Sequence, residues 1–121
     1  MNEEIFDFEN LKVYQKSLKY VDFVYEATKG FPKEEIFSLA NQFRRASVSI
    51  CLNIAEGSGG SKAEFNQFLK IARRSVRECV AVTEISCRQA FISNEYKKQS
   101  RGSCIELSRM INGLMKSLKN K

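Results

Sequence analysis

Apolar residues recur at three- and four-residue spacing through the middle of the chain, and this pattern stops at a cluster of glycines. Such spacing is typical of one side of a helix packed on a core. Gly57, Gly59 and Gly60 end the pattern, because glycine accepts the left-handed backbone that closes a helix. Ser61 and Glu64 then predict a capping box at the start of a new helix. The helical side before the glycines comprises Ile36, Leu39, Phe43, Ala46, Ile50 and Ile54.

The same periodicity recurs elsewhere, so the chain predicts four helices with short connections. The expected helices span about residues 10–29, 33–56, 62–91 and 94–118, after an acidic arm over residues 1–9. No stretch shows the alternation of a β-strand. Short connections favour antiparallel neighbours. We therefore expect one all-α domain over residues 1–121, folded as an antiparallel up-down-up-down four-helix bundle.

The expected helices carry more apolar surface than a simple bundle needs. The first three each show more than one apolar stripe, whereas a four-helix bundle needs one stripe per helix. One interpretation is a broad contact within a single subunit. The other, which we favour, is self-association as a homo-oligomer, because a second apolar side left in water is a liability. The interface residues expected on this interpretation are Val13, Tyr20, Val24, Val48, Leu52, Ile71 and Val82.

The glycine corner is predicted to be structural. Asn53 and Glu56 are expected to bind free backbone groups there, beside Gly57, Ser61 and Glu64. The glycine- and serine-rich run also resembles a phosphate-binding loop. It follows a helix rather than a strand, however, and lacks the GxxxxGK[ST] spacing, so a nucleotide site is not predicted.

Basic residues outnumber acidic ones by 20 to 14, and the resulting pI near 9.3 favours an acidic partner such as RNA or DNA. The third helix has a one-sided basic stripe suited to following phosphate groups. The alternative is a solvated surface with local pairs such as Arg74–Glu78. The fourth helix carries Lys98, Arg109 and Lys116 on one outer side, with the same two interpretations. The stripe consists of Lys70, Arg73, Arg74 and Arg77, and is continued by Arg88.

The chain lacks the residues of most catalytic sites. It contains no histidine, so it has no Ser-His or Cys-His couple and no ordinary zinc site. Its cysteines show no CxxC spacing and lie on or beside apolar helix sides, which predicts buried free thiols. We therefore expect no enzyme activity, no cofactor and no metal. The cysteines are Cys51, Cys79, Cys87 and Cys104.

The expected location is the cytoplasm. The longest weakly polar run, residues 46–52, is far shorter than the roughly 18 residues that a transmembrane helix needs. The first residues are acidic, whereas a signal peptide begins with positive charge.

Four segments carry a family resemblance: FENLKVYQKSL, FPKEEIFSL, QFRRASVSICLNIAEG and SKAEFNQFLKIARRSVRE. Together they resemble the four-helix-bundle proteins encoded in intervening sequences of bacterial 23S ribosomal RNA genes. The most specific part is RRA at 44–46 with NIAEG at 53–57. The resemblance implies a homopentameric ring. It also implies kinship with accessory proteins of diversity-generating retroelements, and hence nucleic acid, a reverse transcriptase or a ribosomal component as partners.

Two functions remain open after these observations. The first is a non-enzymatic oligomeric adaptor that binds RNA or DNA through the basic stripe on the third helix. The second is a protein–protein interaction scaffold, in which the basic residues serve only to keep the assembly soluble.

Overall fold

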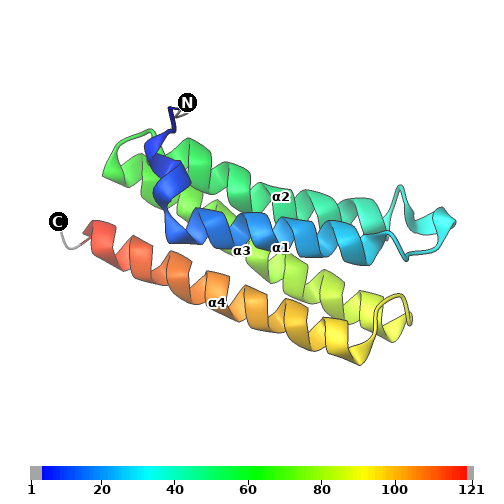
Figure 1. The fold of residues 1–121 in the computed structure, drawn as a ribbon. Coiled ribbons are helices and arrows are strands. Elements are labelled where there is room, and N and C mark those ends of the chain that lie inside the picture. Colours follow the sequence, from blue (N-terminus) through cyan, green and yellow to red (C-terminus); the bar gives the residue numbers. More distant parts are fainter. Residues whose placement is uncertain (1–3, 120–121) are drawn as a thin grey trace.

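The computed structural model describes residues 4–119, which form four α-helices and two short 3-10 turns (Figure 1). No strand occurs within this range, which confirms the all-α prediction. No helix in the described range is both long and apolar enough to cross a membrane. The elements are η1 (Asp7–Asn10), α1 (Lys12–Thr28), η2 (Lys33–Glu35), α2 (Leu39–Ser58), α3 (Lys62–Arg88) and α4 (Asn94–Lys119).

The connections are short, and the chain turns back at each of them. In Figure 1 the ribbons of α1 and α3 run in one direction and those of α2 and α4 in the other. Both termini and the α2–α3 corner lie at the same end. α3 packs between α2 and α4, and α1 closes the arrangement by contacting α2 and α4. The outer side of the α1–α2 pair is therefore opposite to the outer side of the α3–α4 pair.

The capping box predicted at the α2–α3 corner is present. The Ser61 hydroxyl accepts a hydrogen bond from the Glu64 amide at 3.1 Å, and the Glu64 carboxylate accepts one from the Ser61 amide at 2.8 Å. The Ser61 amide, followed by the Ser61 hydroxyl, holds the pKa of Glu64 below its usual value, because hydrogen bonds to the carboxylate stabilise its charged form. The start of α3 is thus fixed by its own first turn.

The corner glycines do not adopt the left-handed backbone that the sequence analysis expects, so that expectation is wrong. Gly57 is required instead because it has no side chain. No glycine within residues 4–119 has positive φ, and Gly59 ends α2 at φ −82°. Gly57 lies within α2, where an added Cβ would come 2.5 Å from the Cβ of Phe68. Gly57 therefore lets α2 and α3 approach closely at the corner.

Asn53 and Glu56 do not hold the corner as expected. The Asn53 side chain donates to the carbonyl and the hydroxyl of Ser49, one turn earlier in α2, at 2.8 and 3.0 Å. Glu56 is exposed, and its carboxylate makes no hydrogen bond within the described range. The backbone carbonyl of Glu56 does accept a hydrogen bond, from the amide of Gly59 at 3.3 Å.

α2 begins at Leu39, six residues later than the pattern predicts. Pro32 is followed by η2, and the Ser38 hydroxyl donates to the Glu35 carboxylate at 2.8 Å. This local bond favours a turn over a continuous helix. Ile36 is consequently exposed rather than part of the core, and Phe37 projects into solvent with 93% of its surface exposed.

α3 ends at Arg88 rather than Phe91 because a Schellman motif closes it. The Phe91 amide donates to the Ser86 carbonyl at 2.9 Å, and the Ala90 amide donates to the Cys87 carbonyl at 3.0 Å. Ala90 occupies the left-handed position of the motif at φ 63°, where glycine is usual. The Phe91 ring then packs on Phe31, with ring centroids 5.4 Å apart.

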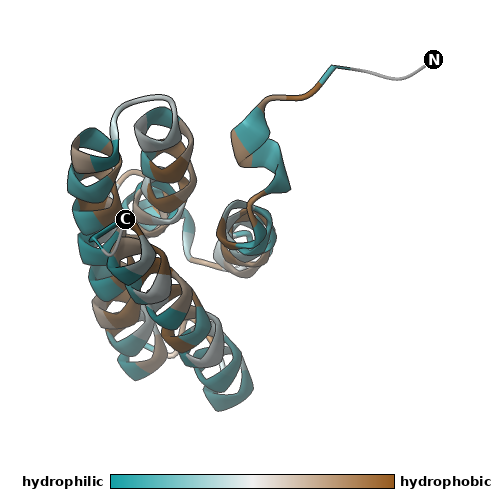
Figure 2. Ribbon diagram, turned by 90° about the vertical axis from the view of Figure 1, so that its left-hand side faces the viewer, coloured by the Kyte–Doolittle hydropathy of each residue, from teal (hydrophilic) through white to brown (hydrophobic). Residues whose placement is uncertain are grey.

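The core contains several residues that the pattern assigns to an oligomer interface. Four of these are buried inside the single subunit, so that part of the prediction is wrong. The reason on α1 is that this helix contacts both α2 and α4 and presents a wide side to them. Figure 2 shows hydrophobic and hydrophilic segments alternating along each helix, as expected for helices with one buried side. The four corrected residues are Val13, Tyr20, Val24 and Val82.

A buried chain of hydroxyl groups joins three helices. The Tyr20 hydroxyl of α1 and the Thr83 hydroxyl of α3 each form a 2.8 Å hydrogen bond with the Ser100 hydroxyl of α4. The Cys104 thiol also donates to the Tyr20 hydroxyl, at 3.4 Å. Burial raises the pKa of Tyr20, so the phenol stays protonated and is able to donate. The register of α1 on α3 and α4 is thereby fixed by polar contacts as well as by packing.

Candidate nucleic-acid interface

The basic stripe predicted on α3 faces outward. Lys70, Arg74 and Arg77 are exposed, and Arg73 is half-buried beside α4. No salt bridge joins these four residues to a carboxylate within residues 4–119, and the alternative pair Arg74–Glu78 is not formed. Their charges are therefore not neutralised by close carboxylates of the described chain.

Arg88 differs from the rest of the stripe. Its guanidinium contacts the Glu84 carboxylate at 3.1 Å, and Lys97 of α4 contacts the same carboxylate at 2.9 Å. These two cations hold the pKa of Glu84 below its usual value, the Lys97 hydrogen bond contributing most. The structure thus places Arg88 in a local ion cluster at the end of the stripe.

α4 extends the basic surface. The Arg73 guanidinium donates to the Asn112 side-chain oxygen at 2.9 Å, which fixes the side of α4 that adjoins the stripe. Helical spacing places five further cations on or beside that side of α4. We call the combined surface the basic face. It comprises Lys70, Arg73, Arg74 and Arg77 of α3 with Lys98, Arg101, Arg109, Lys116 and Lys119 of α4.

The sequence patterns identify only part of this surface. They select Lys98, Arg109 and Lys116, but they do not show that these residues adjoin α3. Arg101 and Lys119 are missed entirely. The available signal was the register of antiparallel helices, in which residues at similar distances from the α3–α4 connection lie side by side, as Arg73 and Asn112 do.

The opposite side of the bundle carries several exposed apolar residues among polar ones. Leu18 and Tyr25 of α1 and Leu52 of α2 are exposed, and Val48 lies half-buried beside them. We call these four residues the apolar face. Arg44 also lies there, but its Nε donates to the Thr28 hydroxyl at 2.7 Å and its guanidinium lies 5.0 Å from the centre of the Tyr25 ring. Three interface residues from the prediction are thus at the surface: Val48, Leu52 and Ile71.

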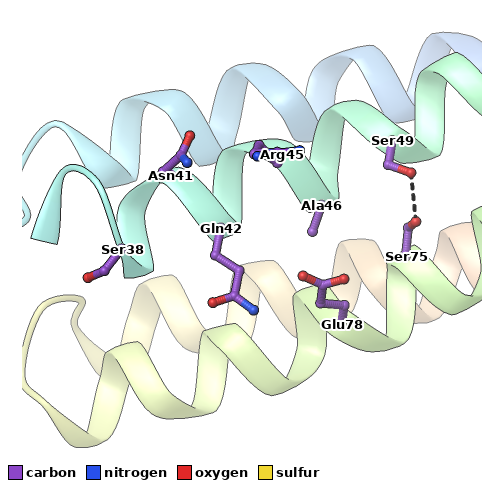
Figure 3. A pocket seen from close by; sticks show the side chains of 8 residues that line it. All are labelled: Ser38, Asn41, Gln42, Arg45, Ala46, Ser49, Ser75 and Glu78. Atoms are coloured by element: carbon purple, nitrogen blue, oxygen red, sulfur yellow. Dashed lines mark hydrogen bonds between the residues drawn. The ribbon is translucent and has the colours of Figure 1, made fainter.

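A polar groove of about 420 Å³ lies between α2 and α3. Figure 3 shows Gln42 of α2 and Glu78 of α3 extending into the space between the two helices. The Ser75 hydroxyl donates to the Ser49 hydroxyl at 2.9 Å and closes one end. Glu78 is the only carboxylate among the lining residues of the described chain, so the groove offers no paired carboxylates for acid–base chemistry.

The cysteines are placed apart from both faces. Cys51, Cys79 and Cys104 are buried and Cys87 is partly buried, and all four are free thiols, as predicted. Burial raises the pKa of the Cys51, Cys79 and Cys104 thiols, which keeps them protonated and unreactive. No cluster of three or more histidine, cysteine, aspartate or glutamate residues suited to a metal ion occurs within residues 4–119.

Comparison with known proteins identifies the family. The family model described as 23S rRNA-intervening sequence protein matches residues 9–113. The chain belongs to this family. The match confirms the resemblance seen in the sequence, and it extends over almost all of the described helices.

A solved structure shows the same fold. It is the crystal structure of a protein of unknown function from the S23 ribosomal protein family of Bacteroides thetaiotaomicron, at 24% identity and a TM-score of 0.79. The alignment covers 86% of this chain and 98% of that one. A search of curated proteins found no match. Family membership thus fixes the fold and a connection with 23S rRNA intervening sequences, and the function has to be argued from the two faces.

Proposed function

We propose that this 23S rRNA-intervening sequence protein is a non-enzymatic, oligomeric adaptor that binds RNA or DNA through its basic face. The observation that carries the proposal is the separation of charge. Cations from two helices gather on one side of the bundle, and Lys70, Arg73, Arg74 and Arg77 form no salt bridge within the described range, while Glu84 already binds Arg88 and Lys97. A surface of one sign attracts a polyanion and releases its counterions on binding.

The assembly belongs to the same proposal. The apolar face would contact a second copy, because exposed apolar side chains on neighbouring helices favour association. A homopentameric ring of up-down-up-down bundles is the arrangement that the family resemblance implies. The alternating ribbon directions in Figure 1 support this topology. In such a ring the basic faces, which lie on the other side of each subunit, stay free for nucleic acid.

A second candidate is a protein–protein interaction scaffold. The exposed apolar residues favour it, because Phe37 and Leu52 offer contact area to a protein partner as well as to another copy. In that case the cations of the basic face only keep the assembly soluble. A reverse transcriptase or a ribosomal component is the partner class that family kinship suggests, and the cytoplasm is the compartment that suits either role.

Binding of fluorescent RNA across a salt series separates the two candidates. The adaptor predicts affinity that falls steeply between about 50 and 200 mM salt, with a log–log slope whose magnitude decreases by about 0.7 to 0.9 for each phosphate contact removed. A Lys70/Arg73/Arg74/Arg77→Ala variant should therefore bind more weakly and with a shallower slope. Binding equal to that of the parent, or no binding by either protein, supports the scaffold.

A further inference from the structure

The basic face lacks the side chains that hold unpaired bases. Proteins that bind single strands combine a basic groove with exposed aromatic rings on which successive bases stack. Between the cations of the basic face, the outward positions carry small, amide or aliphatic residues such as Ala81, Asn112 and Ile105. A base therefore finds no ring to stack on there.

The exposed aromatic residues lie elsewhere in the described chain. Tyr25 belongs to the apolar face, Phe37 precedes α2, and Phe6 precedes η1. Tyr96 is on α4, but its ring packs on Phe23 of α1 with centroids 5.3 Å apart, on the side away from α3. None of these exposed aromatic rings of the described chain therefore belongs to the basic face.

The basic face is also long, straight and firmly held. From Lys98 to Lys119 it extends about 32 Å along α4, at 1.5 Å per residue. This length corresponds to roughly ten phosphates of one strand at 3.4 Å spacing. The Arg73–Asn112 hydrogen bond and the Glu84 cluster join the two helices, so their rows of cations keep a fixed separation.

We propose that the ligand of the basic face is double-stranded nucleic acid, held by the phosphates of both strands. This inference rests on the function proposed above and specifies its substrate class. A duplex carries one charge per about 1.7 Å of its axis, twice the density of one strand, and it is a stiff rod that matches a rigid face. A flexible single strand would contact the same cations but lose its conformational freedom with no stacking in return. Because only phosphates are contacted, binding is independent of base sequence.

The test compares ligands of equal phosphate number. Fluorescence anisotropy at fixed salt measures the dissociation constants of an RNA duplex, a DNA duplex and an unstructured oligouridine. Both duplexes are expected to bind at least about tenfold more tightly than oligouridine, and two unrelated duplex sequences should agree within about twofold. The variant Lys70/Arg73/Arg74/Arg77→Ala should lose the duplex preference. Lys12/Lys16/Lys19/Lys29→Ala removes the same charge from α1 and its C-cap and should keep the preference.

The outcomes separate the two claims. Duplex preference that is lost only in the α3 variant supports the inference. Oligouridine that binds as tightly as either duplex, with both weakened in the α3 variant, overturns the inference and leaves the nucleic-acid function standing. A preference for one duplex sequence over another overturns the phosphate-only account. Absence of binding to every ligand overturns both the inference and the proposed function.

Discussion

Arginine lies both on the basic face and beside the apolar face, and its surroundings differ between the two. Beside the apolar face, the Arg44 guanidinium donates to the Thr28 hydroxyl and stacks over the Tyr25 ring. On the basic face, Arg74 and Arg77 extend from α3 with no carboxylate bound to them in the described range. Arg44 is thus held against the protein by local partners, whereas Arg74 and Arg77 present their charge to solvent.

The structure also divides the two apolar stripes of α1 between the core and the surface. Val13 and Val24 are absorbed by the core, whereas Leu18 and Tyr25, from the other stripe of the same helix, remain exposed. The surface left for the proposed self-association is therefore smaller than the sequence pattern suggests, and it lies opposite to the basic face.

The largest expected effect is the loss of assembly in Leu52→Arg. Leu52 is 55% exposed at the centre of the apolar face, and a buried arginine there would carry an unpaired charge into the contact between copies. Light scattering should show a multimer for the parent and a folded monomer for the variant. Ile105→Arg is the matched control, because Ile105 is 47% exposed beside the basic face. An unchanged mass for Leu52→Arg, or dissociation of Ile105→Arg, would contradict the assignment of the interface.

Gly57→Ala should separate the helices that carry the two faces. An added Cβ would lie 2.5 Å from the Cβ of Phe68, and backbone must move to relieve that contact. We expect the free energy of unfolding to fall by about 2–3 kcal/mol in urea denaturation. Gly113→Ala is the control, since no atom outside its own helix lies within 4 Å. It should gain about 1 kcal/mol from helix propensity. A stable Gly57→Ala variant would show that α2 and α3 do not meet as described.

Much of this fold follows from sequence pattern, and the exceptions have local causes. Four helices and the Ser61 capping box are predictable, because periodicity and capping chemistry act over a few neighbouring residues. The late start of α2 follows the 3-10 turn η2 and a hydrogen bond between Ser38 and Glu35. The end of α3 depends on an alanine at a position that favours glycine, which no pattern indicates.

The candidate site was less predictable for a related reason. Periodicity finds the α3 stripe, but it does not reveal which side of α4 adjoins it. It also gives two apolar sides of α1 without ranking them. The side of α1 that carries Tyr20 faces the core, where the Tyr20 hydroxyl forms a hydrogen bond with the Ser100 hydroxyl of α4. This contact is far apart in the sequence, so periodicity does not indicate it.

Tyr20→Phe tests that contact. Removing the hydroxyl deprives Ser100 and Cys104 of a buried partner, so we expect a loss of about 1–2 kcal/mol in the free energy of unfolding. Tyr25→Phe removes an exposed hydroxyl and should change stability by less than about 0.5 kcal/mol. Equal stability of the two variants would show that the buried hydroxyl chain does not hold α1 in its register.

Ala90→Gly should stabilise the end of α3, where the chain turns towards α4. Ala90 has φ 63°, a conformation that costs a residue with a Cβ roughly 1 kcal/mol. The expected gain in unfolding free energy is about 1 kcal/mol, measured by urea denaturation. The same substitution at Ala81, inside α3, should instead lose about 1 kcal/mol. Destabilisation by Ala90→Gly would indicate a different closing conformation.

The smallest effect concerns the pH dependence of the α2–α3 corner. The folded state lowers the pKa of Glu64, so its contribution is present above the unfolded-state pKa and is lost as the pH falls through the folded-state pKa. Urea denaturation from neutral to acid pH should show the parent losing its advantage over Glu64→Gln across that interval. A constant difference between the two proteins at all pH values would mean that the carboxylate is not the capping group.

Sedimentation velocity with a labelled RNA duplex tests most directly the claim that the two faces have separate roles. The parent should sediment as a multimer and carry the label with it. Lys70/Arg73/Arg74/Arg77→Ala should keep the same multimeric mass and leave the label behind. A parent that sediments as a single subunit, or a variant that loses both its assembly and its RNA together, would contradict the account.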